Sequence, residues 1–413
     1  MSSVALPRAR ALASELRFDR HELSGAFGDS GVLFPLAASL IAINGLNPTV
    51  VFAGAGLFYV AAALYFRLPM PVQPLKAFSA IAIAFALTPS VIAAGALILG
   101  AAFLVLGATG LIRVVGRVVP IGVVKGIQLA LGIALLRSAW DLSQRSQGLA
   151  AVPAAVGAFG VSIPVGVPLA ILGVALALVL LRWRVAPASV VVLAAGASIG
   201  AIAGSDIGTL ELGPIAPALV VPSLGDWWLA LTLLAIPQLP LSIGNAMLST
   251  HDVARTYFGR GADRVTLTSL ATSMGIANVA AGLFAGMPMC HGAGGLTAHH
   301  RFGARTAAAT LTIGAACLVL GLVFGRSALE VIARGVPPAI LGSLLAYVGW
   351  EHIQLARAQR GAASWATCLA VALLATVTAN LAVGAVAGLV GWYAVRSAGS
   401  IHGRMRGYAA REV

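Results

Sequence analysis

The sequence is poor in charged side chains, and acidic ones are scarcest. Of its 413 residues only 9% are charged, Asp and Glu together number 13, and 59% are hydrophobic. Soluble domains carry roughly 25% charged residues, so this chain has too little charge to cover a water-exposed surface of its size. A multi-pass membrane protein is therefore predicted. The 48 glycines suit the close approach of helices in a bilayer.

Cysteine is also scarce, which bears on redox and metal chemistry. Cys290, Cys317 and Cys368 lie far apart and show no spacing typical of a metal site or of a disulfide framework. We expect them to be small packing residues. The polar, arginine-containing N-terminus lacks an A-x-A-like site after the first apolar run, so no cleavable signal is expected. The net charge of +13 is assigned to cytoplasmic loops, and no aromatic-plus-basic motif favours a nucleic-acid partner.

Apolar stretches separated by polar, glycine or proline breaks indicate about fourteen membrane segments in an all-α fold. A full crossing needs about 20 apolar residues, so the third and tenth segments are too short to cross alone and are predicted to be half-helices. Only Asn380 separates the last two. The segments are 28–44, 48–66, 74–87, 90–111, 118–137, 164–181, 187–204, 227–248, 266–286, 291–300, 306–325, 336–354, 363–379 and 381–397.

The arginines test this order of segments. With the N-terminus in the cytoplasm, only Arg137, Arg145, Arg326 and Arg334 fall outside, while the other loop arginines fall inside, as expected of a membrane protein. We therefore expect a multi-pass protein of the bacterial inner (cell) membrane with both termini cytoplasmic. The predicted divisions are a tail at 1–25, a first repeat at 26–204, an extracytoplasmic linker at 205–226, a second repeat at 227–397 and a tail at 398–413.

Features of the first half recur roughly 218 residues later. Pro69-Met70 recurs as Pro288-Met289, and Pro120 recurs as Pro338 at the start of the equivalent segment. The two short segments hold the same place in each half. Seven crossings per half is an odd number, so the halves must be inverted relative to each other. Inverted repeats with interrupted helices are typical of transporters that bind substrate near the bilayer midplane.

Two polar stretches are predicted to form the ends of the half-helices. In the first, Pro74 suits the first helical position, which puts Gln73 at the mouth of the helix and Lys76 one turn inside it. In the second, Gly292, Gly294 and Gly295 leave the backbone open to a ligand. The free N–H groups of a helix start carry partial positive charge and attract anions. Two such ends facing each other would form an anion site.

Several stretches together resemble a known family. The sequence is similar to the molybdate transporters related to the sulfate permeases in these motifs: Phe27-Gly28-Asp29-Ser30-Gly31, Pro71-Val72-Gln73-Pro74-Leu75-Lys76, Pro237-Gln238-Leu239-Pro240-Leu241, Pro288-Met289-Cys290-His291-Gly292-Ala293-Gly294-Gly295 and Arg301-Phe302-Gly303-Ala304-Arg305-Thr306. The resemblance implies a uracil-permease-like fold of seven plus seven inverted segments, a core domain that moves against a gate domain, and a homodimer. The C-terminal tail leaves no room for the STAS regulatory domain of typical sulfate permeases.

The expected substrate contacts are Gln73, Lys76, Ala77, Gln238, Asn245, His291, Gly292, Ala293 and Gly294. Each polar member has a plainer alternative. The amides of Gln73, Gln238 and Asn245 could tie helices together. Lys76 could pair with Asp29 or extend to the membrane surface, and His291 could be a satisfied core histidine.

Asp29 and its neighbour Ser30 form a separate pair of candidates. An intramembrane acid suggests a functional site, and a carboxylate touching a dianion directly would repel it. We therefore expect a coupling or structural role for the pair, with Asp29 carrying a proton or capping a helix start.

These features favour a secondary transporter that imports a tetrahedral oxyanion, with molybdate first and sulfate as the alternative. A nucleobase permease would be expected to carry an acid where Gln238 and Asn245 stand. An intramembrane enzyme would need a nucleophile–base pair or metal cluster, and a channel would need charged rings or symmetry. No cofactor or metal is predicted. The partners expected are the anion, membrane lipid and a coupling ion, either H⁺ or Na⁺.

Overall fold

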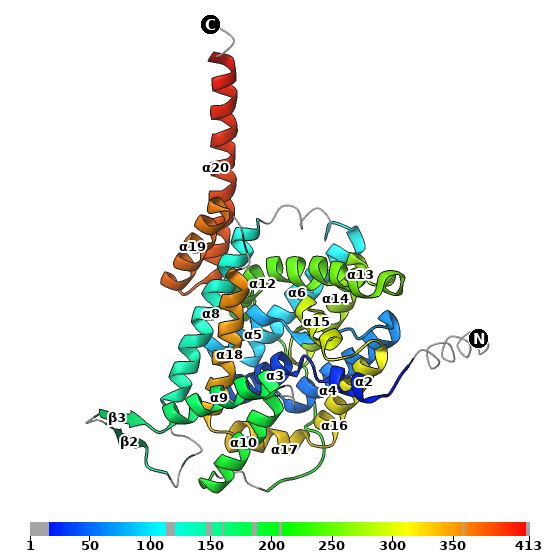
Figure 1. Cartoon of the computed structure of the whole chain (residues 1–413), viewed down its shortest axis with the longest axis vertical. Helices are drawn as coiled ribbons and strands as arrows, with labels where there is room; N and C mark the ends of the chain where they lie inside the picture. Colours follow the sequence, from blue (N-terminus) through cyan, green and yellow to red (C-terminus); the bar gives the residue numbers. More distant parts are fainter. Residues whose placement is uncertain are drawn as a thin grey trace, which may run out of the picture.

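The computed structural model describes residues 16–112, 120–145, 149, 152–158, 161–183, 188–205, 209–357, 359 and 361–409. Within them the chain is mostly helical (Figure 1). Five helices are long and apolar enough to cross a membrane: Arg20–Asn44, Pro48–Phe66, Pro89–Thr109, Ile121–Ser143 and Leu224–Ala262. Ala307–Leu322 and Gly325–Gly335, bent by 86°, would make a sixth. The molecule is therefore a multi-pass membrane protein.

The first half of the chain folds into helices whose ends follow local capping signals. Its helices are α2 (Arg20–Ala26), α3 (Ser30–Asn44), α4 (Pro48–Phe66), α5 (Lys76–Ala84), α6 (Pro89–Thr109), α8 (Ile121–Ser143), α9 (Gly166–Trp183) and α10 (Ala188–Ile202). Asn47 and Thr88 cap α4 and α6, each followed by a proline at the first helical position. Gly45 ends α3 in the left-handed conformation.

The second half contains α11 (Leu224–Leu229), η1 (Ala230–Ala235), α12 (Ile236–Leu241), η2 (Ser242–Ser249), α13 (Thr250–Phe258), η3 (Gly259–Ala262), α14 (Leu267–Leu283), α15 (Ala293–Arg301), α16 (Ala307–Leu322), α17 (Gly325–Glu330), η4 (Val331–Gly335), α18 (Pro338–Arg357), α19 (Ala362–Val377) and α20 (Leu381–Ala409). Wide π-helical turns flank α12. Pro237 and Pro240 lack the N–H that regular helical hydrogen bonds need, so a change of helical pitch here is expected.

Helices from the two halves pack against each other in matched pairs. Helix α4 packs on α16, and α6 packs on α14. Helix α8 packs on α18, α8 also contacts α19, and α18 contacts α9. The interface between the two halves therefore runs through the whole body of the molecule.

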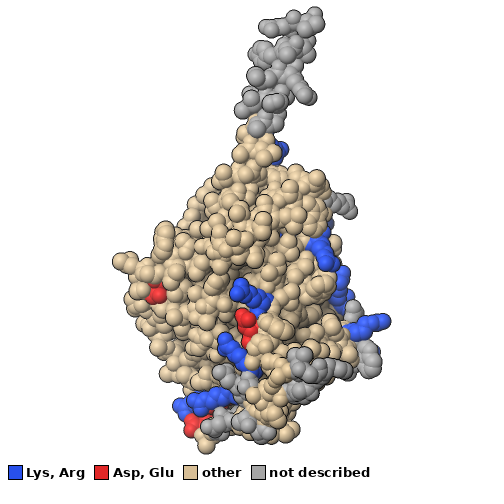
Figure 2. All heavy atoms as spheres, turned by 90° about the vertical axis from the view of Figure 1, so that its left-hand side faces the viewer, with Lys and Arg blue, Asp and Glu red and all other residues tan. Residues whose placement is uncertain are grey.

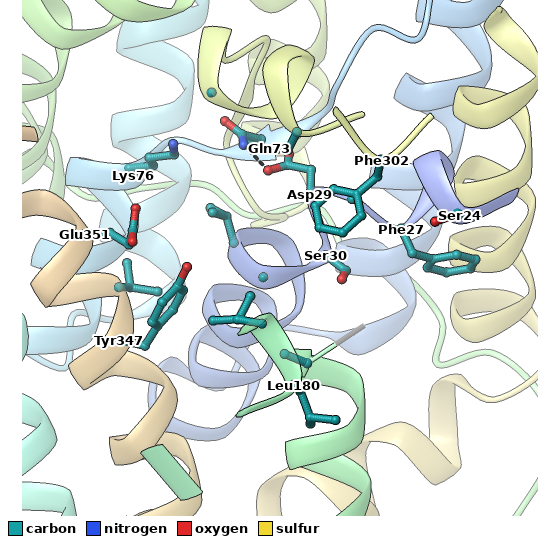
Figure 3. Close-up of a pocket in the computed structure, with 18 of the residues that line it drawn as sticks. Ser24, Phe27, Asp29, Ser30, Gln73, Lys76, Leu180, Phe302, Tyr347 and Glu351 are labelled. Carbon is teal, nitrogen blue, oxygen red and sulfur yellow. Dashed lines mark hydrogen bonds between the residues drawn. The ribbon is translucent and has the colours of Figure 1, made fainter. Parts of the chain in front are cut away.

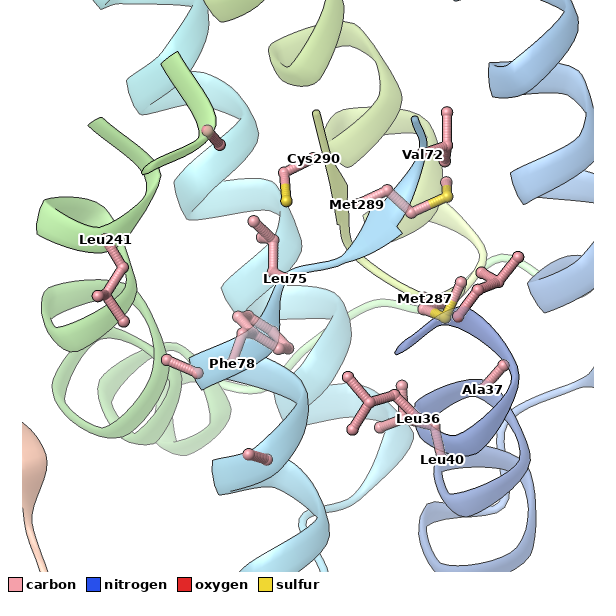
Figure 4. Packing of buried hydrophobic residues seen from close by; sticks show 14 of the residues in the cluster. Leu36, Ala37, Leu40, Val72, Leu75, Phe78, Leu241, Met287, Met289 and Cys290 are labelled. Carbon is pink, nitrogen blue, oxygen red and sulfur yellow. The ribbon is translucent and has the colours of Figure 1, made fainter. Parts of the chain in front are cut away.

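Two short strands lie where the paired half-helices begin. Strand β1 (Gln73–Pro74) pairs antiparallel with β4 (Met289–Cys290), with Gln73 opposite Cys290. Val72, Leu75, Phe78 and Met289 pack as buried hydrophobics around this pair (Figure 4). The predicted helix start at Pro74 is wrong, because Pro74 belongs to the strand and α5 begins at Lys76.

Other departures from the expected fold are peripheral. A second small sheet, β2 (Ala155–Ala158) with β3 (Val161–Pro164), lies in the loop between α8 and α9, so the fold is not purely helical. Helix α20 continues to Ala409, through most of the tail predicted at 398–413. Helix α2 falls at the end of the tail predicted at 1–25, whose residues 1–15 lie outside the described part. The three cysteines are buried and free, as expected.

Candidate functional site

A cavity of about 670 Å³ lies beside the start of α5, where the strands β1 and β4 meet. Its walls include residues of α2, α3, α9, α15 and α18 (Figure 3). Five of the residues expected from the sequence line it: Asp29, Ser30, Gln73, Lys76 and Gly294. Much of the remaining lining is apolar, with Phe27, Leu180, Val348 and Leu355 among the contributors. The cavity therefore brings a small polar group together inside an apolar wall.

Lys76 supplies the positive charge of this group. It is the first residue of α5, not one turn inside it as predicted. Its Nζ lies 3.9 Å from where a Cβ on Gly294 would stand, so the ammonium group faces the start of α15. The ion pairs found among the described residues do not include Lys76. A half-buried ammonium without a direct counter-ion attracts an anion strongly in a cavity of low dielectric constant.

Asp29 and Gln73 form a buried pair next to the lysine. Gln73 Nε2 donates to both carboxylate oxygens of Asp29, at 2.6 Å each (Figure 3). Asp29 stands at the N-cap position of α3 but makes no side-chain capping bond. Its carboxylate is therefore held by Gln73, and the capping role and the direct pairing with Lys76 considered above are both wrong.

The glycines at the start of α15 make room for this pair. A Cβ on Gly292 would overlap Gln73 Oε1, and a Cβ on Gly295 would lie 2.5 Å from Asp29 Oδ2. Any larger residue at either position would collide with the polar pair. Gln73 and Gly292, from opposite halves of the chain, are thus in direct contact, as the sequence predicted.

The other expected contacts do not line the cavity. Gln238, buried on α12, accepts a hydrogen bond from the N–H of Phe78 and donates to Ser242, both at 2.9 Å. Phe78 lies in the first turn of α5, whose N–H groups have no partner within the helix. Gln238 therefore satisfies one of the groups predicted to receive the anion. Asn245 on η2 and the buried Ala77 also stand outside the cavity lining.

His291 is fully buried and has partners on both ring nitrogens. Nδ1 lies 2.9 Å from the carbonyl of Pro71, and Nε2 lies 2.9 Å from the hydroxyl of Ser273. A carbonyl can only accept, so Nδ1 donates and Nε2 can accept. The ring packs between Phe58 and Phe66. The structure thus gives His291 the environment of a satisfied core histidine, beside Gly292 and Ala293 at the start of α15.

Two polar residues of the cavity wall and two anchors are among those that the sequence analysis missed. Tyr347 and Glu351 project from α18 on the same side as Lys76 (Figure 3). Asn44 donates to the carbonyls of Ala82 and Leu87, and Asn278 binds the backbone of Met289 in both directions. The signal for these two anchors is an isolated amide in an otherwise apolar helix, the argument applied above to Gln73, Gln238 and Asn245 and equally applicable to Asn44 and Asn278.

A helical membrane protein with a cavity lined by a lysine and an arginine has the architecture of a membrane transport protein. Figure 2 shows one face of it, where charged side chains are few. Residues 21–135 and 230–351 match the family described as "Molybdate transporter of MFS superfamily". The chain belongs to this family, which consists of transporters and not of enzymes.

Individual relatives agree with this family assignment. The chain is 30% identical over 372 residues to Molybdate transporter 2 of Arabidopsis thaliana, covering 80% of this chain and 77% of that protein. It is 27% identical over 487 residues to Molybdate transporter 1 of Chlamydomonas reinhardtii, covering 94% and 93%.

Solved structures show the same fold at lower identity. The transmembrane domain of a cyanobacterium bicarbonate transporter, BicA, matches with a TM-score of 0.64 and 19% identity, over 90% of this chain and 98% of that one. Murine Slc26a9, an anion transporter solved in the inward-facing state, matches with a TM-score of 0.65 and 14% identity, over 95% and 71%. These likenesses show a shared fold, and the family match with its molybdate transporters supports anion transport.

Proposed function

We propose that this protein imports molybdate across the bacterial inner (cell) membrane by alternating access. The anion binds at Lys76, between the starts of α5 and α15. The observation that carries this proposal is the half-buried ammonium of Lys76, which faces Gly294 in the cavity and makes no ion pair with any described residue. Two helix starts beside it add the partial positive charge of their N–H groups. Such a site attracts a dianion without enclosing it permanently.

An inverted repeat of two seven-segment halves, at 26–204 and 227–397 with a linker at 205–226, is part of this proposal. Helices α5 and α15 act as the two half-helices. Both have nine residues and each follows a two-residue strand. The backbone turns to positive φ just before each strand region, at Arg67 and Ala285. In the proposed repeat α4 corresponds to α14 and α6 corresponds to α16. The α4–α16 contact is then the symmetry equivalent of the α14–α6 contact, and both are present.

The direction of the cavity supports an inward-facing state with cytoplasmic termini. Arg20 and Leu355 line the cavity at the side that the arginine distribution assigns to the cytoplasm. We propose that the wall carrying α18 moves as the gate against the core that carries α3, α5 and α15. Outward opening would then expose Lys76 to the other side of the membrane.

Import of a dianion into a negatively charged cell opposes the membrane potential by about 2.3 kcal/mol per charge per 100 mV. A coupled cation must supply this energy, and we propose H⁺ carried by Asp29, with Na⁺ as the alternative. Sulfate has nearly the same shape as molybdate and is the alternative substrate. Molybdate is preferred because the relatives described above are named for it, and the family resemblance implies a homodimer.

The chain offers a matched pair of lysines to test the site. Lys76→Met should weaken molybdate binding by about tenfold to a hundredfold, because a hydrogen bond to a charged group contributes roughly 1.5–3 kcal/mol. Lys125→Met is the control, since Lys125 on α8 does not line the cavity and its ammonium donates to Gln128 and to the backbone carbonyl of Leu355. Binding is measured by calorimetry on purified protein, and uptake in liposomes with sulfate as competitor.

Two results would overturn this proposal. One is wild-type protein that binds neither molybdate nor sulfate. The other is a Lys76→Met variant that binds and transports like Lys125→Met. Stronger competition by sulfate than by molybdate itself would replace molybdate with sulfate as the substrate.

A further inference from the structure

The side-chain amide of Gln73 has hydrogen-bond partners on its nitrogen but not on its oxygen. Its nitrogen donates to Asp29, whereas its oxygen, Oε1, is buried and has no hydrogen-bond partner among the described residues. An ionised carboxylate can only accept, so the nitrogen must face Asp29 while Asp29 is charged. A buried acceptor without a partner costs free energy. The amide orientation that leaves Oε1 unpaired therefore carries a cost that the opposite orientation of the same amide would avoid.

The unpaired oxygen lies against the start of α15, one of the two helix starts between which the anion is proposed to bind. Oε1 faces Gly292 at the start of α15, and Gln73 itself lines the cavity with Lys76 and Gly294. A carbonyl oxygen carries partial negative charge and repels an oxyanion. The carboxylate of Asp29 lies over the same turn of α15, at Gly295. With Asp29 ionised, the α15 start therefore already has an anionic group beside it, and Gln73 presents an acceptor to the same helix start.

We propose that Gln73 is a positioning residue whose amide turns over when Asp29 takes up a proton, so that its N–H group then faces the anion site. This inference rests on the proposed function and specifies how a proton and an oxyanion enter the site together. On proton uptake from the cavity, one O–H bond forms on Asp29, whose charge changes from −1 to zero. The new O–H donates to Oε1, and Nε2 turns toward Gly292.

Proton uptake then changes the site in two ways at once. It removes a negative charge next to the start of α15, and it replaces a repelling oxygen with a hydrogen-bond donor. Both changes favour a dianion, so proton and anion binding strengthen each other by the same factor, as linkage requires. Release of the proton on the far side reverses both changes and expels the anion.

Other groups near Asp29 must be separated from it in any pH experiment. Tyr59 of α4, Cys290 of β4 and Tyr347 of α18 carry protons whose ordinary pKa values lie above neutrality. The other ionisable side chains that line the cavity are Arg20 of α2, Lys76 of α5, and Glu351 and His352 of α18. Glu351→Gln and His352→Gln therefore serve as controls for the pH effect.

The test measures molybdate affinity against pH by calorimetry, over a range in which free molybdate stays a dianion. In the wild type, affinity should be highest at low pH and fall by about tenfold per pH unit above the pKa of Asp29, the slope for one linked proton. Asp29→Asn keeps a neutral donor toward Oε1, so its affinity should not vary with pH. Glu351→Gln and His352→Gln should keep the wild-type slope.

The variant Gln73→Met tests whether the amide turns over, because a turning amide and a fixed amide predict different losses of molybdate affinity at low and high pH. It should lower the low-pH affinity by about tenfold, the effect of one lost hydrogen bond, and leave the high-pH affinity equal or higher, because there the amide presents oxygen. Gln128→Met is the control, since Gln128 on α8 is also buried but accepts from Lys125 and does not line the cavity. The wild type should also take up about one proton per molybdate, measured in buffers of different ionisation enthalpy without any substitution.

The outcomes separate the two proposals. An equal loss in Gln73→Met at low and high pH overturns the turning amide. A wild-type slope retained in Asp29→Asn, or no proton uptake by the wild type, overturns the role of Asp29. Absence of molybdate binding to the wild type at every pH overturns the proposed function instead.

Discussion

The two nine-residue helices beside the cavity begin in opposite ways. Helix α5 follows a proline-rich segment and starts with Lys76, so it offers side chains. Helix α15 starts after Gly292 and places Gly294 and Gly295 in its first turn, so it offers bare backbone. The two starts complement each other, because the glycines of α15 leave the space that Gln73 and Asp29 occupy. In this site α5 therefore supplies the charged side chain, and α15 supplies the space that the polar pair needs.

The two helices are also held in place differently. The end of α5 is fixed by Asn44, which donates to the carbonyls of Ala82 and Leu87. Strand β4, which leads to α15, is fixed by Asn278 through three hydrogen bonds to Met274 and Met289. Both asparagines are buried. A buried amide therefore anchors the end of α5 in one half and the strand before α15 in the other, and neither bond uses the residues at the helix starts.

The largest effect is expected from adding one methyl group on the glycine side. A Cβ in Gly295→Ala would lie 2.5 Å from Asp29 Oδ2 and 2.7 Å from the Cβ of Pro71, so the pair or the helix start must shift. Overpacking of this kind costs about 1–3 kcal/mol, which predicts a fall in molybdate affinity of about tenfold to a hundredfold. Calorimetric titration of the folded variant measures it.

Gly54→Ala provides the matched control for this prediction. Gly54 lies in α4 and has nothing within 4 Å of an added Cβ, so molybdate affinity should match the wild type. Wild-type affinity in Gly295→Ala would show that the space at the start of α15 does not control the anion site.

Features set by neighbouring residues could be predicted from the sequence, whereas features set by contacts between the two halves could not. Segment ends set by local chemistry were predictable, since Asn47-Pro48 and Gly45 specify a helix start and a helix end. The start of α5 was placed wrongly because Pro74 pairs with Met289, a partner from the other half that no local pattern shows. Asp29 and Gln73 were both recognised as candidates, yet their mutual bond is a tertiary contact. The acid of α18, Glu351, was missed because an acid near a segment end looks like an ordinary surface residue.

The second prediction compares the two glutamines near α5. Gln238→Leu removes the acceptor of the Phe78 N–H and the donor to Ser242, leaving a buried backbone group unpaired. The free energy of unfolding should fall by about 1–3 kcal/mol, seen as a lower melting temperature in detergent. The loss of molybdate affinity should be smaller than in Gln73→Met at low pH, because Gln238 does not line the cavity.

Gln238→Glu is the informative companion variant. It keeps an acceptor for Phe78 but adds a possible negative charge beside the start of α5. If Gln238 contacts the anion directly, Gln238→Leu would instead weaken binding as much as Gln73→Met while stability stayed near the wild type. That result would restore Gln238 to the site predicted from the sequence.

The smallest effect is expected on the cavity wall that α18 forms. Glu351 places an exposed carboxylate in the cavity on α18, on the same side as Lys76 (Figure 3). Glu351→Gln removes its repulsion of the dianion and should raise molybdate affinity by about two- to fivefold at low salt, since exposed charges interact weakly in water. The gain should shrink as ionic strength rises, because salt screens such charges. Glu330→Gln is the control, since Glu330 pairs with Arg334 at 3.1 Å on α17 and η4, outside the cavity lining. Weaker binding in Glu351→Gln would mean that the carboxylate helps to hold Lys76 in place, and the division between a cationic core and a repelling gate would have to be abandoned.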